Sequence, residues 1–202
     1  MPAYLHPDPD DYGVTKPVIF WQQKVAVLTP SPEGPIVFGG PLPKGEGMGG
    51  AILHAVFTIP LRAIPGFEKL PVESLPLVFP FRHDGGRAEY RVARDGSVSG
   101  WVVEPPLPAD GWPYPGYPQE FAGVRYECSE FEPIDEAESL RLLHQDTGAD
   151  ADRDVLVIVP SRSNDPSLPV NLWNDPEDEH CVQCVFVFNT ETNEVAAFTD
   201  VD

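Results

Sequence analysis

The residues best suited to chemistry are two cysteines and a histidine near the C-terminal end. They stand in the segment His180-Cys181-Val182-Gln183-Cys184. A Cys-x-x-Cys pair brings two sulfurs close enough to bind zinc or to form a disulfide. A structural zinc site needs four ligands, and Cys128 could complete the set. The segment also has the pattern of a strand, in which Cys181 and Cys184 would point to opposite faces. Buried cysteines in a sheet are therefore the alternative, and we expect no cofactor, with zinc as the exception to test.

An acidic cluster lies directly before these cysteines. Asp175, Glu177, Asp178 and Glu179 follow Trp173 within a few positions. Such a loop can keep a sheet edge soluble. It can also form a contact surface for a basic protein. The carboxylates would attract the basic residues of that protein, and Trp173 would be the apolar anchor, since tryptophan is enriched at the centres of interfaces. We take these five residues as the candidate partner-binding site.

A third group consists of aromatic residues around a proline-rich connection at 104–118. Its members are Trp101, Trp112, Tyr114 and Tyr117. Aromatic clusters of this kind either pack into a core or line a ligand-binding or enzymatic cleft for a small apolar or sugar-like molecule. Both interpretations stay open at the level of the sequence.

Other catalytic and metal signatures are missing. Residues 150–154 (DADRD) resemble the start of a calcium loop, but the EF-hand pattern needs Gly and Glu where Val155 and Ser161 stand. The serines lack a Gly-x-Ser-x-Gly setting, and the glycine pairs match neither a phosphate loop nor a dinucleotide fingerprint. We therefore expect a non-enzymatic protein with no catalytic residues.

The negative charge is concentrated in the second half of the chain. Residues 1–100 carry 9 Lys and Arg against 10 Asp and Glu, whereas residues 101–202 carry 4 against 22, which gives −1 and −18 of the total of −19. Such a surface repels phosphate and anionic lipid and attracts basic proteins. We expect a basic protein partner and neither nucleic acid nor a membrane. Arginines 82, 87, 91 and 94 form the one basic stretch, and they could instead neutralise the acidic half.

Composition sets the class of protein. The 202 residues include 25 prolines, which break helix interiors, and a hydrophobic fraction of 42%, which is enough for a core. Three cysteines do not form a secreted disulfide framework. The sequence has neither a secretory leader nor a long apolar stretch, so we expect a cytoplasmic protein.

The elements that must position these residues are mostly short strands. Apolar and β-branched runs predict a strand pair or a bent strand at residues 18–28, and strands at 36–38, 51–59 and 77–81. A hairpin is predicted from 88–92 and 97–103 around Asp95-Gly96, and a last strand pair from 182–189 and 194–198. Residues 154–160 predict a strand covered on both faces. A capping box at Asp135 and Glu138 predicts one helix, ending near Gly148.

These elements predict an α+β fold that is rich in β structure, with mixed, mostly antiparallel sheets and one or two helices. We expect residues 1–17 to form an N-terminal arm and residues 18–202 a single domain. The sequence leaves open whether two subdomains meet near 104–118. His54 lies on an apolar strand and is expected to be a core residue rather than a ligand.

Four motifs, taken in order, are similar to the YwqG-like family of bacterial proteins of unknown function. They are residues 38–45 (FGGPLPKG), residues 51–59 (AILHAVFTI) with Leu70-Pro71, residues 115–120 (PGYPQE), and residues 155–159 with 172–175 (LWND) and 185–188 (VFVF). The resemblance covers roughly residues 36–198.

The chain departs from the family pattern at three places. The family has Gln where Val56 stands, a second Gln near Ile158, and Gly where Asn174 stands. If those glutamines serve a shared site, this chain has lost it. The family brings no established reaction, so the resemblance implies a fold and not an activity.

Overall fold

The structure is a computed structural model that describes residues 3–5, 13–45, 52–81, 87–104, 118–142, 149–150, 152–162, 164–170, 172 and 182–201. Twelve strands, one short α-helix and one 3-10 turn make up the regular structure of these residues. The strands are β1 Val18–Trp21, β2 Lys24–Pro30, β3 Ile36–Phe38, β4 His54–Pro60, β5 Ser74–Phe79, β6 Arg87–Val92, β7 Val98–Glu104, β8 Val124–Cys128, β9 Glu132–Pro133, β10 Val155–Val159, β11 Val182–Asn189 and β12 Glu194–Val201. The helix α1 is Glu136–Leu142, and the 3-10 turn is Leu61–Ala63.

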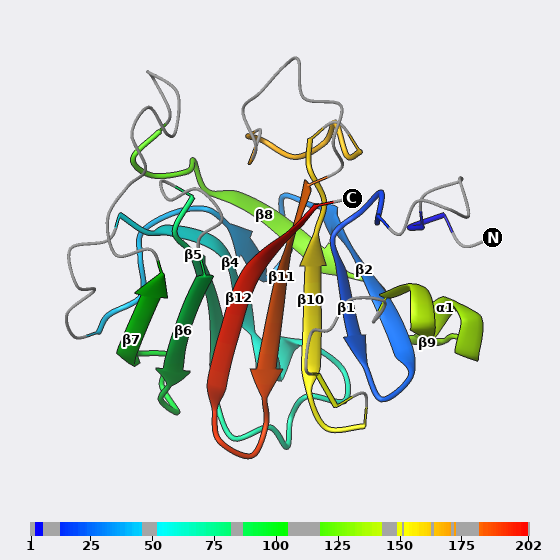
Figure 1. Cartoon of the computed structure of the whole chain (residues 1–202). Coiled ribbons are helices and arrows are strands. Elements are labelled where there is room, and N and C mark those ends of the chain that lie inside the picture. Colours follow the sequence, from blue (N-terminus) through cyan, green and yellow to red (C-terminus); the bar gives the residue numbers. More distant parts are fainter. Residues whose placement is uncertain are drawn as a thin grey trace.

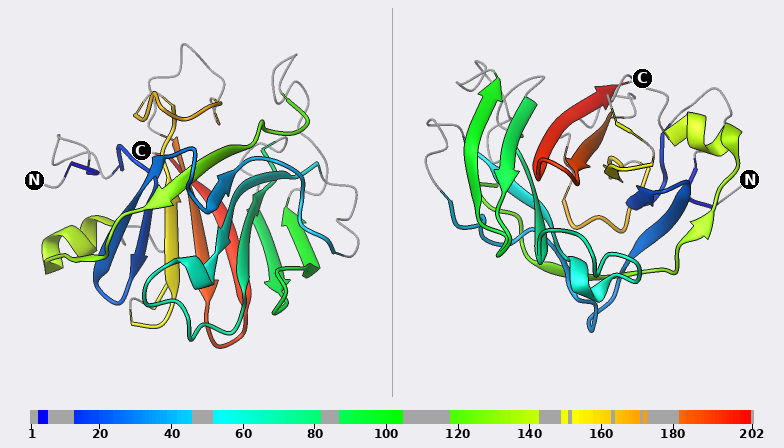
Figure 2. Two further views of the ribbon diagram at one scale, coloured as in Figure 1. Left: turned by 180° about the vertical axis from the view of Figure 1, so that it is seen from behind. Right: turned by 90° about the horizontal axis from the view of Figure 1, so that it is seen from below.

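The strands form one continuous sheet that curls over on itself (Figures 1 and 2). Its order is β5-β4-β3-β8-β2-β1-β10-β11-β12-β6-β7, and β9 pairs with β2. β2 turns the corner of the curl, since its first half pairs with β1 and its last residues, Leu28 to Pro30, pair with β8. A strand that passes from one sheet to the next is a common way to build such a corner.

The expected α+β class is wrong. Every strand ladder within the described residues is antiparallel, and α1 has only seven residues, so the protein is nearly all β. The start of the helix is correct: the Glu138 amide donates to Asp135 Oδ1 at 2.8 Å, and the Asp135 amide donates to Glu138 Oε2 at 3.3 Å. This capping box fixes where a helix begins but not how long it is. The expected end near Gly148 lies outside the described residues.

The predicted strands are confirmed within a few residues. β6 and β7 form the hairpin around Asp95-Gly96, and Gly96 has the positive φ of +83° that this turn requires. β11 and β12 form the last pair in the register 189 to 194. β4 begins at His54 rather than at residue 51.

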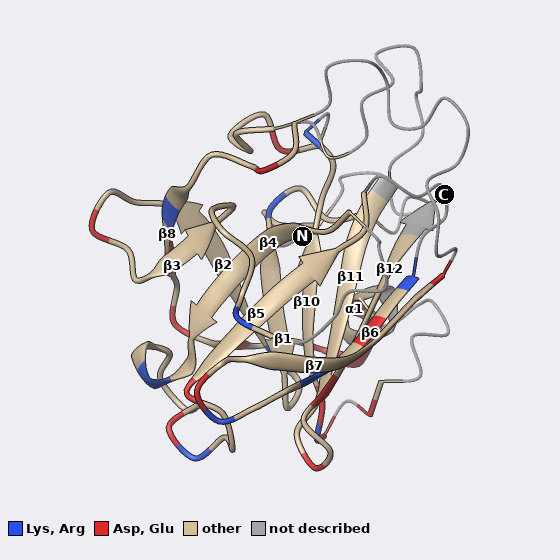
Figure 3. Ribbon diagram, turned by 90° about the vertical axis from the view of Figure 1, so that its left-hand side faces the viewer, with Lys and Arg blue, Asp and Glu red and all other residues tan. Residues whose placement is uncertain are grey.

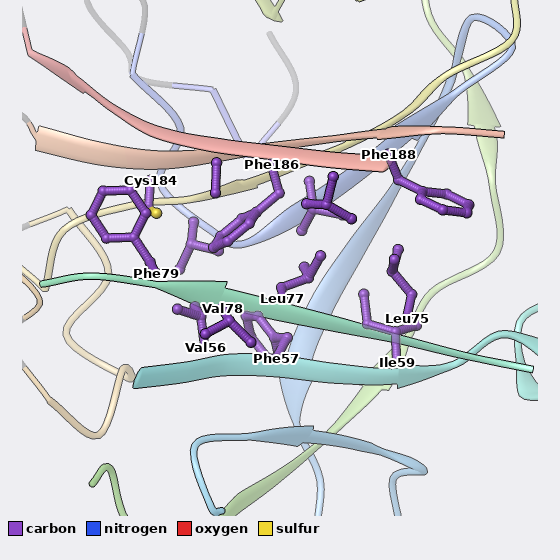
Figure 4. Packing of buried hydrophobic residues seen from close by; sticks show 14 of the residues in the cluster. Val56, Phe57, Ile59, Leu75, Leu77, Val78, Phe79, Cys184, Phe186 and Phe188 are labelled. Carbon is purple, nitrogen blue, oxygen red and sulfur yellow. The ribbon is translucent and has the colours of Figure 1, made fainter. Parts of the chain in front are cut away.

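The main core fills the inside of the curl. Cys184, Phe186 and Phe188 of β11 point across the interior toward Leu77 and Phe79 of β5 (Figure 4). The two halves of the long sheet thus bury their apolar faces against each other, as the layers of a β-sandwich do.

A second core lies on the outer face of β1, β10 and β11. Leu156 and Ile158 of β10 belong to it, while Val155, Val157 and Val159 belong to the main core. The strand predicted to be covered on both faces is therefore confirmed. The cover comes from Leu142 of α1 and from a group of residues in the segment expected to be an arm, which are Tyr4, Leu5 and Val14.

Candidate functional site

The predicted partner-binding residues cannot be placed. Trp173, Asp175, Glu177, Asp178 and Glu179 all lie outside the described residues. The candidate acidic surface must therefore be sought among the carboxylates of the C-terminal half that the structure does describe.

Six of those carboxylates form an acidic strip along β8, β9 and α1. The strip consists of Glu127, Glu130, Glu132, Asp135, Glu136 and Glu138, and residues 127–138 contain no Lys or Arg. Five of the six are exposed and Glu138 is half-buried. In the described part of the chain none of them forms an ion pair with a Lys or Arg side chain. Two basic residues lie beside the strip: Lys24 pairs with Pro133 in the ladder, and Arg125 lies two residues before Glu127 on β8, where its Nη1 donates to the Gly34 carbonyl at 3.1 Å.

Local structure holds the strip in place. β8 exposes Glu127 because its neighbour Tyr126 points into the core, and β9 pairs with β2 through Glu132 and Val25. The capping box then fixes Asp135 and Glu138 at the start of α1.

The field of the strip reaches the phenol of Tyr4 on the neighbouring N-terminal segment. Burial raises the pKa of Tyr4 to about 12, and the negative charges of Glu138, Glu132 and Asp135 add to the shift. These three carboxylates therefore act on one point as a group. A phenolate there would be repelled by all of them.

The other described carboxylates of this half are mostly paired or buried. Arg153 binds Asp150 at 2.6 Å and Glu191 at 3.1 Å, where β10 begins and β11 turns into β12. The hydrogen bond from the Asp152 amide lowers the pKa of Asp150 most, and the hydrogen bond from the Arg153 side chain lowers this pKa further. The described carboxylates thus do not form one surface: some bind arginines, whereas the six of the strip, like the more scattered Glu104, Glu120 and Asp152, form no ion pair in the described structure.

The arginine hairpin does not neutralise the strip. Arg87 binds Glu89 on its own strand at 2.6 Å, and Arg91 binds Glu194 of β12 at 2.6 Å. Arg94 lies 3.5 Å from Glu73. Among the described residues, Glu194 is the single carboxylate of the C-terminal half that these three arginines bind. Arg82 lies outside the described residues.

The proposed metal ligands are only partly visible. Cys184 is buried in the main core, and Cys128 is half-buried at the end of β8. Burial raises the pKa of Cys128 to about 11 and that of Cys184 well above its ordinary value. Both thiols therefore resist the deprotonation that zinc binding requires. His180 and Cys181 lie outside the described residues, so the zinc set stays a prediction.

The aromatic pocket is likewise only partly visible. The Trp101 ring packs against the Tyr90 ring at a centroid distance of 4.4 Å and contacts the main core. Trp112, Tyr114 and Tyr117 lie outside the described residues, so the cleft stays a prediction. His54 is a core residue, as expected: it is buried, stacks on Phe121 at 4.7 Å and donates from Nε2 to the Pro118 carbonyl at 2.9 Å.

Two features were missed by sequence reasoning. The first is a buried carboxylate, Asp165, which accepts a hydrogen bond from Lys16 Nζ at 2.9 Å. The second is a hollow of about 600 Å³ on the outer face of β11, β12, β6 and β7. A lysine and an aspartate 149 positions apart give no local signal of contact, and the hollow depends on the register of several strands.

Comparison with known proteins adds no family. A scan of protein-family models finds no match to the chain, and comparisons with curated proteins and with solved structures find none either. The resemblance to the YwqG-like family therefore stays a prediction. In the described part of the chain no helix is both long enough and apolar enough to cross a membrane.

Proposed function

We propose that this chain is a non-enzymatic cytoplasmic protein that binds a basic partner protein through the acidic strip. An inhibitor or immunity protein that captures a basic toxin or nuclease would act in this way. The observation that carries the proposal is the state of the strip: six carboxylates within twelve positions, five of them exposed, and none ion-paired in the described structure.

The physical argument is that the carboxylates of the strip are not neutralised by basic side chains of the described structure. Carboxylates that already bind arginines, such as Glu194 and Asp150, have little attraction left for a partner. Unpaired carboxylates at close spacing repel one another, and a basic surface would relieve that repulsion. Complementary charge of this kind accelerates encounter and selects against acidic partners.

Residues Trp173, Asp175, Glu177, Asp178 and Glu179 remain part of the proposal as predicted contacts. An apolar anchor beside acidic residues would add affinity to the charge-driven encounter. Their contribution is separable from that of the strip, because substitutions can be made in either set alone.

The test compares two variants of equal net charge. The strip variant carries Glu127→Gln, Glu130→Gln and Glu136→Gln, three residues whose carboxylates accept no hydrogen bond in the described structure. The control carries Glu33→Gln, Glu104→Gln and Glu120→Gln, which are also exposed but lie elsewhere. Each is immobilised and used at low salt to capture basic proteins from the native host.

The proposal expects the wild type and the control to retain the same basic protein, and the strip variant to lose most of it. Raising the salt should release that protein, because exposed charges are screened beyond about 10 Å at 0.1 M salt. Equal capture by all three proteins, or no basic partner for any of them, would remove the support for the proposal.

A further inference from the structure

The outer hollow lies where two rows of side chains cross the sheet. One row is apolar at both ends and contains Leu156, Val187, Ala196, Glu89 and Val102, one from each of β10, β11, β12, β6 and β7. The next row is polar and contains Asn189, Glu194, Arg91 and Ser99. Asp154 immediately precedes β10 and lies at the end of this polar row.

The hollow forms over Ala196. This residue has only a methyl group between the larger Val187 and Glu89, so the surface is lower there. Val102 at the far end is 49% exposed and is the one large hydrophobic side chain that the described residues expose. The floor is therefore apolar at Val187 and Ala196, whereas Glu89 in the same row belongs to the charged rim.

The charges on the rim are paired with each other. Arg91 binds Glu194, and Arg87 binds Glu89 through both Nε at 2.9 Å and Nη2 at 2.6 Å. Arg87, Glu89 and Arg91 thus alternate in charge along one face of β6 (Figure 3). These pairs leave no net charge to recognise a ligand.

Asp154 is the exception. It is 5% exposed and lines the hollow. Its Oδ2 accepts the Asp150 amide at 2.9 Å, while its buried Oδ1 has no hydrogen-bond partner in the described structure. The nearest arginine in sequence, Arg153, binds Asp150 and Glu191 instead. A buried carboxylate oxygen without a donor is costly to fold, and a ligand that donates would satisfy it.

We propose that the hollow binds a linear aliphatic ammonium group. The nitrogen would donate a hydrogen bond to Asp154 Oδ1, and the methylene chain would lie over Val187 and Ala196. Asp154 and Ala196 are two strands apart and two residues apart along the strand, about 12 Å in all, which an alkyl chain of about five carbons spans when its nitrogen binds Oδ1 and its far end contacts the alanine methyl. A primary ammonium fits because it supplies both the charge and the N–H donors that this oxygen lacks.

This chemistry can come from a free amine or from a lysine side chain. The proposal is independent of binding through the acidic strip, since the hollow and the strip are built on different strands. The strip variant described above should therefore bind an alkylammonium ion as the wild type does.

The test is a titration of the ¹⁵N-labelled full chain with pentylammonium chloride, with pentanol as the uncharged probe. We expect saturable shifts at Val187 and Ala196 with a dissociation constant of about 1–10 mM for the ammonium ion, and no saturation with pentanol. A lysine blocked at both termini serves as the second probe. Binding of pentylammonium alone assigns the site to small amines, and binding of both extends it to lysine side chains.

Three variants decide whether Asp154 is responsible. Asp154→Asn should weaken binding about tenfold or more, because it removes a charge-assisted hydrogen bond. Ala196→Leu should block binding by filling the hollow, even if Asp154→Asn folds poorly. Asp152→Asn, an exposed neighbour outside the hollow, should bind as the wild type does. Absence of saturable wild-type binding up to about 50 mM, or unchanged binding in both site variants, would overturn the proposal.

Discussion

The hydroxyl of Tyr90 accepts a hydrogen bond from the backbone amide of Val78 at 2.9 Å. The same hydroxyl donates to the Pro76 carbonyl at 2.9 Å. Tyr90 belongs to β6 and both backbone groups belong to β5, which are near opposite ends of the sheet order. One phenol therefore closes the curl by satisfying backbone groups on the free edge of β5, where a neighbouring strand would otherwise pair.

Replacing Tyr90 with Phe should destabilise the fold strongly. The substitution leaves a buried amide and a buried carbonyl without partners, which costs about 2–4 kcal/mol in total. The measurement is the free energy of unfolding in urea. Tyr126→Phe is the matched control, because the Tyr126 hydroxyl is equally buried but has no hydrogen-bond partner in the described structure. A loss at Tyr90 no greater than that at Tyr126 would show that the phenol does not close the curl.

The pair of Lys16 and Asp165 should stabilise the fold more than an exposed ion pair does. The Asp165 side chain is fully buried, whereas that of Lys16 is 38% exposed. Lys16→Met keeps the aliphatic stem but leaves the carboxylate without its cation, at a cost of about 1–3 kcal/mol. Arg62→Met, which breaks the exposed pair with Glu73, should cost less than about 1 kcal/mol. Urea unfolding of both variants checks the order, and the reverse order would contradict this account of the pair.

The described cysteines should be unreactive in the folded protein. At about pH 8 a thiol whose pKa is about 11 is almost entirely protonated, and the thiolate is the nucleophile. In a Cys181→Ser variant, Cys128 and Cys184 should both react with a thiol reagent far more slowly than a free thiol does. Both should react rapidly in urea. Fast reaction of the native variant would mean that at least one of the two thiols is accessible and ionised.

Stability should fall at alkaline pH. An unfolded tyrosine ionises near pH 10, while burial raises the pKa of Tyr4 and Tyr126 to about 12 and that of Tyr90 further. The folded state therefore holds these protons more tightly. Its stability from this source is fully present below about pH 10 and is lost as the pH rises through about 12. Circular dichroism and tyrosinate absorbance should change together, and Tyr126→Phe should make the fall less steep. Ionisation of all tyrosines near pH 10 without unfolding would contradict the burial.

Local patterns predicted most of the strands, but neither β8 and β9 nor the class of the fold. The run from Val155 to Val159 and the Asp95-Gly96 turn identify their elements because burial and turn geometry act within a few residues. The capping box at Asp135 gives the start of a helix, and its signal led to an overestimate of helical content. The corner in β2 and the hydrogen bonds between the Tyr90 hydroxyl and the backbone of β5 depend on contacts between distant segments, for which the sequence has no local signal.

The sequence predicted an acidic recognition surface, which stays a prediction, and the six residues of the acidic strip were not among those named for it. Charge counting indicated an acidic recognition surface in the second half of the chain, and the acidic strip lies in that half. Which carboxylates stay unpaired depends on where Arg91 and Arg153 lie in the fold, and neither position follows from composition. The depression over Ala196 likewise needs the register of β10, β11, β12, β6 and β7.

The central claim is that the acidic strip recognises a basic protein, and its most direct test is the association rate of the captured partner at several salt concentrations. The wild type and the control variant should associate rapidly at low salt and slow steeply as salt rises. The strip variant should associate about tenfold more slowly at low salt, with a shallower salt dependence. Identical rates and salt dependence for the strip and control variants would contradict the claim.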